Sequence, residues 1–171
     1  MVEVRVARLG HDSSTNSYVV ILQEKDGQRL LPIWIGQPEA ESIVMQMNNV
    51  KRERPLTHDL CKNLIVGFGG SLRRVQITKV QKNTYYAELH VEGANGIVQI
   101  DARPSDSIAI ALRLSAPIFA QESLLSSADD GEGDEEGAPP SRQTNGEELD
   151  AEQLKEHLEK LRPEDFGKFN L

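Results

Sequence analysis

The chain has 171 residues, of which 38% are hydrophobic, and a formal net charge of -8. This length suits one globular domain with an appendage, because one hydrophobic core rarely extends beyond roughly 150 residues. The acidic balance argues against a protein that wraps nucleic acid through many phosphate contacts, and the single cysteine excludes an intrachain disulfide framework. No apolar run is long enough to span a membrane and the N-terminus lacks a signal-peptide layout, so we expect a cytoplasmic protein without membrane association.

The negative charge is concentrated at the end of the chain. Residues 1–127 hold 14 Lys+Arg and 13 Asp+Glu, whereas residues 128–171 hold 5 and 14. The composition changes near residue 126, and we therefore predict one globular domain over residues 1–126. This part of the chain is close to electrically neutral.

Two further segments are predicted after the globular domain. Residues 127–147 contain no large apolar side chain, so burial cannot offset their ordering entropy, and we predict a disordered acidic linker. Within residues 148–171, Leu154, Leu158 and Leu161 recur at helical spacing and predict a short C-terminal amphipathic helix. Its apolar side must cover either the globular domain or a partner.

Strands are predicted where apolar residues alternate or run together, at residues 2–6, 18–22, 30–35, 74–78, 84–92 and 96–102. Turn residues at 25–28 join the second and third strands in a hairpin. Pro32 lacks an amide donor and therefore predicts an edge strand or a bulge. We expect Tyr18 and Trp34 in the core and His90 on the solvent face of its strand.

Helices are predicted at three places between these strands. The first opens at Gly36, the second has Thr57 as its N-cap, and the third has Ser105 as its N-cap and continues to Ser115. Helical spacing predicts the inward-facing residues to be Ala40, Ile43, Val44 and Met47 in the first helix and Leu60, Leu64, Ile65 and Phe68 in the second. Cys61 beside that second stripe is interpreted as a small buried residue rather than a nucleophile.

Two helix starts combine free backbone amides with polar side chains, an arrangement that can bind a phosphate or a metal ion. The same residue types also cap helices, which stabilises a helix by roughly 0.5 to 2 kcal/mol per cap. Both interpretations stay open, and the sequence does not say whether the two starts converge. The residues concerned are Thr57, His58, Asp59, Arg103, Ser105 and Asp106.

The carboxylates at these starts are candidate metal ligands. Asp59 and Asp106 offer the hard oxygen atoms that Mg²⁺ or Mn²⁺ prefers, and Glu39 is a candidate third carboxylate. In phosphodiester hydrolysis such an ion activates water and neutralises charge on the phosphate. The alternative for Glu39 is structural, because acids in a first helical turn are favoured by the helix dipole.

The remaining polar residues suit the binding of a phosphate and the transfer of a proton. Arg103 or Arg54 could clamp a phosphate through two parallel hydrogen bonds. His58 is the candidate general base or acid. Thr57 and Ser105 add hydroxyl groups for binding substrate. The alternative for Arg54 is an ordinary solvated loop, because the basic cluster of which it is part is short.

Three segments, 31–40, 54–60 and 101–113, resemble the bifunctional nuclease family in the expected order. The resemblance spans residues 2–125. It implies an α+β domain, which we expect to contain a mixed, largely antiparallel sheet with three main helices packed on it. It also implies self-association and nuclease activity toward DNA and RNA. The family motif covers Glu39, Arg54, Thr57, His58, Asp59, Arg103, Ser105 and Asp106, but it assigns none of them a role.

Two hypotheses of different classes follow. The first is a metal-assisted nuclease of low sequence specificity, in which Asp59 and Asp106 hold the ion and Arg103 grips the phosphate. The second is a non-enzymatic dimeric binding module for an anionic small molecule or a protein partner. We expect a homodimer or a higher homo-oligomer in either case.

Overall fold

A computed structural model describes residues 1–12 and 17–127. The predicted linker, apart from Ser127, and the predicted C-terminal helix lie outside the described residues. In chain order the elements are β1 (Val2–Asp12), β2 (Ser17–Glu24), β3 (Leu30–Ile35), α1 (Gln37–Met47), α2 (Thr57–Gly67), β4 (Ser71–Gln81), β5 (Thr84–Gly93), β6 (Gly96–Ala102), α3 (Pro104–Leu114), β7 (Ile118–Ala120) and the short 3-10 helix η1 (Glu122–Leu124). None of the helices in these two ranges is long and apolar enough to cross a membrane.

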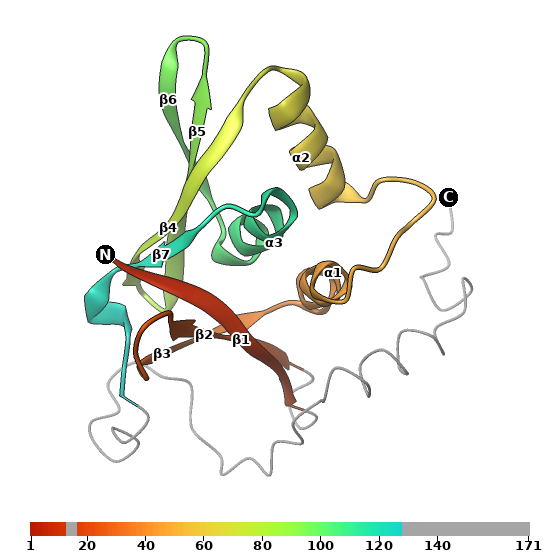
Figure 1. The fold of residues 1–171 in the computed structure, drawn as a ribbon. Helices are drawn as coiled ribbons and strands as arrows, with labels where there is room; N and C mark the ends of the chain where they lie inside the picture. The colour runs from red at the N-terminus through yellow and green to blue at the C-terminus, as the bar shows by residue number, and fades with distance from the viewer. Residues whose placement is uncertain (13–16, 128–171) are drawn as a thin grey trace.

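The strands form one curled, 7-stranded sheet in the order β3-β2-β1-β7-β4-β5-β6 (Figure 1). Neighbouring strands are antiparallel except β4 and β7, which run parallel. The helices α1, α2 and α3 lie on the side toward which the sheet curves (Figure 1). The expected α+β class, with a mixed and largely antiparallel sheet, is confirmed.

Local sequence explains two features of the sheet. Pro32 of β3 lies opposite Ile21 of β2. Because β3 is an edge strand, a residue without an amide donor is tolerated there. In the other half of the sheet, β4 and β5 are joined by Lys82 and Asn83, whose φ angles are 47° and 58°. Two consecutive left-handed residues match the twist of an antiparallel hairpin.

The core lies between the sheet and two helices, α1 and α3. Ile43 of α1 and Ile108 of α3 are fully buried, and α3 also buries small residues such as Ala109 and Ala111. Burying a large apolar side chain stabilises the fold by about 1.5–3 kcal/mol. The first turn of α3 is therefore fixed relative to α1 and the sheet.

α2 departs from the expected pattern because it has no buried residue. Leu60, Leu64 and Phe68 were expected to face the core, but they are exposed, Phe68 by 87%. Ile65 and the half-buried Cys61 are the α2 side chains that pack against the core. The physical reason is that α2 contacts mainly α3 and, to a smaller extent, β4, and these neighbours cover only one narrow side of the helix. We call the exposed residues Leu60, Leu64 and Phe68 the apolar face of α2.

The expected burial of three other residues is wrong. Trp34 is 53% exposed, because in β3 the residues facing the core are Leu31 and Ile33, so Trp34 falls on the opposite face. Met47 is exposed at the end of α1. His90 is buried beside the buried Leu89, so both faces of β5 are covered at this point. Tyr18, in contrast, is buried as expected.

The predicted caps are shifted by one or two residues. α2 begins at Thr57 with Leu56 as its N-cap, and α3 begins at Pro104 with Arg103 as its N-cap. Neither Thr57 nor Ser105 is therefore an N-cap. The amide of Leu56 instead donates to Asp59 Oδ2 at 3.0 Å, and proline suits the first helical position because its missing N–H needs no partner there.

Candidate functional site

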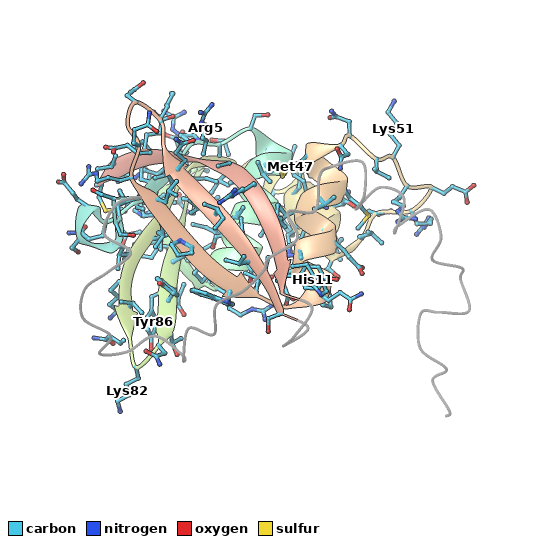
Figure 2. All side chains as sticks on the ribbon, turned by 90° about the horizontal axis from the view of Figure 1, so that it is seen from below. Arg5, His11, Met47, Lys51, Lys82 and Tyr86 are labelled. Atoms are coloured by element: carbon cyan, nitrogen blue, oxygen red, sulfur yellow. The ribbon has the colours of Figure 1, made fainter. Side chains whose placement is uncertain are left out.

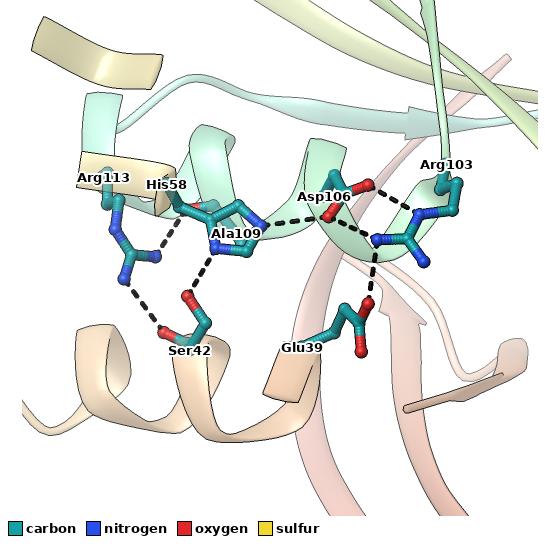
Figure 3. A network of polar contacts seen from close by, with 7 residues as sticks. All are labelled: Glu39, Ser42, His58, Arg103, Asp106, Ala109 and Arg113. Atoms are coloured by element: carbon teal, nitrogen blue, oxygen red, sulfur yellow. Dashed lines mark hydrogen bonds and ion pairs between the residues drawn. The ribbon is translucent and has the colours of Figure 1, made fainter. Parts of the chain in front are cut away.

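The two predicted helix starts converge on the imidazole of His58. From the start of α2, His58 Nε2 lies 3.0 Å from Asp106 Oδ1 in the first turn of α3. On the other side of the ring, His58 Nδ1 lies 2.8 Å from the hydroxyl of Ser42, which comes from α1. Figure 3 shows the three helices meeting at this ring. The contact joins residues that are far apart in the sequence.

Arg103 is held by two carboxylates on one edge of its guanidinium group. Its Nε donates to Asp106 Oδ2 at 2.8 Å, and its Nη2 donates to Asp106 Oδ1 at 3.1 Å. The same Nη2 lies 2.8 Å from Glu39 Oε1 of α1. Within the described residues Nη1 has no such contact, and it turns away from both carboxylates (Figure 3). Arg103 is therefore a cation of fixed orientation whose Nη1 is open.

The carboxyl group of Asp106 is kept ionised by these contacts. Burial alone would raise its pKa, but hydrogen bonds from Arg103 and His58, together with the charge of the guanidinium group, lower it below the ordinary value of 3.8. At neutral pH Asp106 can therefore accept hydrogen bonds but cannot donate one.

This state of Asp106 determines the tautomer of His58. Since the carboxylate can only accept, His58 Nε2 must carry a proton and donate a hydrogen bond to Asp106. In the neutral ring Nδ1 then holds the lone pair and accepts from the Ser42 hydroxyl. Nδ1 is the atom of the cluster able to take up a further proton, and Ser42 Oγ covers it.

Asp59 lies next to His58 in the sequence, yet its carboxylate is directed elsewhere. Its Oδ1 accepts from Arg113 Nε at 2.6 Å, and its Oδ2 accepts from the amide of Leu56 at 3.0 Å. Burial acts to raise the pKa of Asp59, but the bonds from Arg113 and Leu56 outweigh it and the pKa lies below its ordinary value. The side chain of Arg113 is 3% exposed. This ion pair connects the first turn of α2 to α3.

An open cleft of about 1080 Å³ runs along the cluster. Its wall includes Glu39, Arg54, Thr57, His58, Arg103 and Asp106, so six of the eight predicted site residues border one space. Asp59 and Ser105 are not part of this wall. The loop after α1 supplies Lys51 and Arg54 at the rim, and neither forms an ion pair among the described residues. Lys51 projects outward from this loop, at the opposite end of the molecule from Lys82 (Figure 2).

A second, smaller pocket of about 370 Å³ lies on the other side of Arg103. Ser105 lines this pocket together with the exposed Trp34 and the half-buried Tyr85. Arg103 borders both spaces. The predicted hydroxyl ligand Ser105 is therefore separated from Thr57 by the arginine.

Sequence reasoning did not assign two residues of this network, Ser42 and Arg113. Ser42 is a buried polar residue on the core side of α1, three positions after Glu39, and a serine at that helical spacing was the available signal. Arg113 is an isolated cation in a strongly apolar helix. It also donates to the carbonyl groups of Ala109 and Ser42. A buried arginine requires an acidic partner, which Asp59 provides.

The arrangement of donors does not match the predicted metal site. Arg103 lies between the carboxylates of Glu39 and Asp106, so the cation that neutralises them is already a side chain. Both oxygen atoms of Asp59 accept hydrogen bonds elsewhere. In residues 1–12 and 17–127, no three side chains of His, Cys, Asp or Glu are grouped as metal ligands usually are. The assignment of Asp59, Asp106 and Glu39 to a metal stays a prediction.

The fold and the site together define a class: an α+β domain whose helix starts form a histidine, aspartate and arginine cluster in an open cleft. The chain belongs to the bifunctional nuclease domain family, whose sequence pattern matches residues 20–131. The family named from three sequence segments is therefore confirmed.

The relatives differ in how much of each chain is matched. An uncharacterized protein of Mycobacterium tuberculosis is 41% identical over 169 residues, which cover 97% of this chain and 98% of that protein. Bifunctional nuclease 1 of Arabidopsis thaliana is 33% identical over 109 residues, which cover 61% of this chain and 34% of that protein. Bifunctional nuclease 1 of Oryza sativa subsp. indica is 29% identical over 117 residues, or 67% and 35%. The plant proteins thus contain much sequence that has no counterpart in the match.

Proposed function

We propose that this chain is a nuclease that hydrolyses phosphodiester bonds in DNA and RNA with low sequence specificity. The observation that carries the proposal is the cluster of His58, Asp106 and Arg103 on the wall of an open cleft, in a chain of the bifunctional nuclease domain family. Contacts to the phosphate backbone carry no sequence information directly, so a site built around arginine and histidine is expected to be unspecific.

Arg103 is the proposed phosphate ligand. Its Nε and Nη2 are bound to Asp106 and Glu39, so the guanidinium plane is fixed before substrate arrives and Nη1 faces open space. Hydrogen bonds between a guanidinium group and a phosphate are charge-assisted and short. Arg54 and Lys51 at the rim of the cleft are placed to contact neighbouring phosphates. Thr57 adds a hydroxyl group to the same wall.

His58 is the proposed proton acceptor. Hydrolysis requires water to lose a proton as it attacks phosphorus, and the leaving oxygen to gain one. Nδ1 of His58 takes the first proton through the Ser42 hydroxyl, and Asp106 stabilises the imidazolium that forms. The same imidazolium then returns a proton to the leaving oxygen. Asp106 therefore positions His58 as well as Arg103.

The test is cleavage of fluorescent single-stranded DNA and RNA oligonucleotides by highly purified full-length protein. We expect His58→Ala to lower kcat about 100-fold, the lower bound of typical general acid–base contributions. Arg103→Met should raise KM and lower kcat. Arg73→Met is the matched control, because Arg73 of β4 is likewise an exposed arginine that forms an ion pair, in its case with Glu92 at 3.4 Å. Cleavage that is equal in all four proteins would refute the proposed site.

Assistance by Mg²⁺ or Mn²⁺ stays a prediction of its own. Cleavage that stops with EDTA and returns with Mn²⁺ would support it, and Asp106→Asn and Asp59→Asn would show which carboxylate is needed for Mn²⁺ binding in a calorimetric titration. If EDTA leaves the rate unchanged and Mn²⁺ releases no heat, the metal assignment is wrong while the nuclease proposal stands.

The alternative is a non-enzymatic binding module for an anionic small molecule. The near-neutral charge of residues 1–127 favours it, because tight nucleic-acid binding usually relies on a basic surface. Inorganic phosphate or a nucleotide would then bind at Arg103 with no turnover. Calorimetry with phosphate, wild-type protein and Arg103→Met, combined with the absence of cleavage, would decide in favour of this alternative.

We also propose that two copies of this chain associate through the apolar face of α2 and the edge strand β6. Within the described residues β6 pairs with β5 alone, and it exposes Ile97, Val98 and Ile100. α2 and β6 lie at the same end of the molecule (Figure 1). An edge strand can pair antiparallel with its own copy across a two-fold axis, because the two surfaces are then identical.

Light scattering with size-exclusion chromatography tests this association. We expect the wild-type protein to elute as a dimer and Val98→Lys, a charge at the strand edge, to elute as a monomer. Arg74→Glu on the paired strand β4 is the control for a change of surface charge. A monomeric wild-type protein at concentrations of tens of micromolar would refute the interface.

A further inference from the structure

We infer that the second pocket, between Trp34, Tyr85 and Arg103, binds an unpaired nucleobase, so that the substrate at this site is a single-stranded segment. The inference rests on the proposed nuclease function and adds the class of substrate. Three observations carry it: an exposed tryptophan at the pocket, the size of the space, and the position of Arg103 between pocket and cleft.

Trp34 is the first observation. It is the only tryptophan of the chain, and it is 53% exposed on the edge strand β3. Trp34 is not part of the core, since Leu31 and Ile33 are the side chains of this strand that point inward. A large exposed aromatic side chain beside a basic group is the element that single-strand-binding proteins use to stack bases. Stacking accepts every base, which agrees with low sequence specificity.

The size and lining of the pocket are the second observation. The space of about 370 Å³ is large enough to hold a nucleobase. Tyr85, from the beginning of β5, forms another wall, and burial raises its pKa, so the phenol stays neutral and can donate a hydrogen bond near a phosphate. Asn83 of the β4–β5 turn and Thr84 at the start of β5 add polar groups suited to the edge of a base. Lys82 marks the tip of this turn in Figure 2.

Arg103 provides the third observation because it borders both the pocket and the cleft. In a nucleotide the base and its phosphate are attached to the same sugar, so a base against Trp34 brings its own phosphate toward the guanidinium group. Nη1 is the nitrogen left open for that phosphate. A base within a duplex is stacked on both faces and paired at its edge, and it must leave the helix before it can enter such a pocket.

The experiment uses the intrinsic fluorescence of Trp34, which reports from this pocket because no other tryptophan is present. Full-length protein in EDTA is titrated with a short oligothymidylate and, separately, with a blunt-ended duplex of the same length. We expect the single strand to quench the fluorescence and to bind at least 10-fold more tightly than the duplex. Equal affinity for both, or binding of the single strand with unchanged fluorescence, would overturn the inference.

Variants separate this inference from the proposed function. By anisotropy of a labelled oligothymidylate, Trp34→Leu should weaken binding about 5- to 100-fold and Trp34→Phe should weaken it less. Tyr86→Leu is the matched control, because Tyr86 is an aromatic residue of β5 that lies outside both pockets and outside the proposed interface between copies. Normal binding and cleavage by Trp34→Leu would overturn the inference and leave the nuclease proposal intact. Protein that neither binds nor cleaves any nucleic acid would overturn both.

Discussion

Replacing Asp59 with alanine distinguishes a structural aspartate from a catalytic one. The change leaves the guanidinium group of Arg113, whose side chain is 3% exposed, without its charged partner. Removing one member of a buried ion pair costs about 3–5 kcal/mol, and the lower end applies because Asp59 itself is 31% exposed. Loss of the bond from the Leu56 amide adds about 1 kcal/mol. We therefore expect the free energy of unfolding to fall by about 4 kcal/mol, a large part of the roughly 5–15 kcal/mol of a typical domain.

Urea unfolding followed by circular dichroism measures this change, with the m-value as a check on two-state behaviour. The pH dependence provides a second reading. Since the pKa of Asp59 in the folded state lies below its ordinary value of 3.8, its contribution is complete well above that pH and is lost as pH falls through the lowered value. The difference between wild type and Asp59→Ala should therefore shrink in acid. An unchanged unfolding free energy together with lost cleavage would show that Asp59 acts in the reaction instead.

Further predictions concern the cleft. Glu39→Gln should strengthen binding of single-stranded DNA several-fold, because Arg103 Nη2 loses one of its two carboxylate partners; weaker binding in a salt titration would contradict this. Ser42→Ala should lower kcat and leave the affinity for an oligonucleotide unchanged, since Ser42 contacts His58 Nδ1. Asp106→Asn should lower cleavage at neutral pH, where the wild-type carboxyl group is ionised because its pKa lies below the ordinary value and holds both His58 and Arg103; cleavage equal to that of the wild type would contradict this.

Much of the fold was predictable because its signals are local. Alternation of apolar residues, the turn at Lys82 and Asn83, and Pro104 before an apolar run each depend on neighbouring residues only. β7 was not predicted, because three residues following α3 carry no periodicity. Yet this strand joins the two halves of the sheet by pairing with β1 on one side and with β4 on the other.

The apolar face of α2 shows why periodicity alone misplaces residues. Leu60, Leu64 and Phe68 have the spacing of a buried stripe, and spacing indicates that they share one side of the helix. Whether that side meets the core depends on which neighbours surround the helix. Here α3 contacts the side that carries Cys61 and Ile65, so the larger stripe is left for another surface.

The sequence by itself determined the class of fold, the family, and the residue types that gather at the two helix starts, because each is encoded in short segments. Tertiary structure alone decided which of those residues meet. It brought His58 to Asp106 across 48 positions and turned Asp59 toward Arg113. Neighbours in the sequence were thereby separated, since adjacent residues on a helix point about 100° apart. The packing of three helices thus assigned Asp106 to the cleft and Asp59 to the joint between α2 and α3.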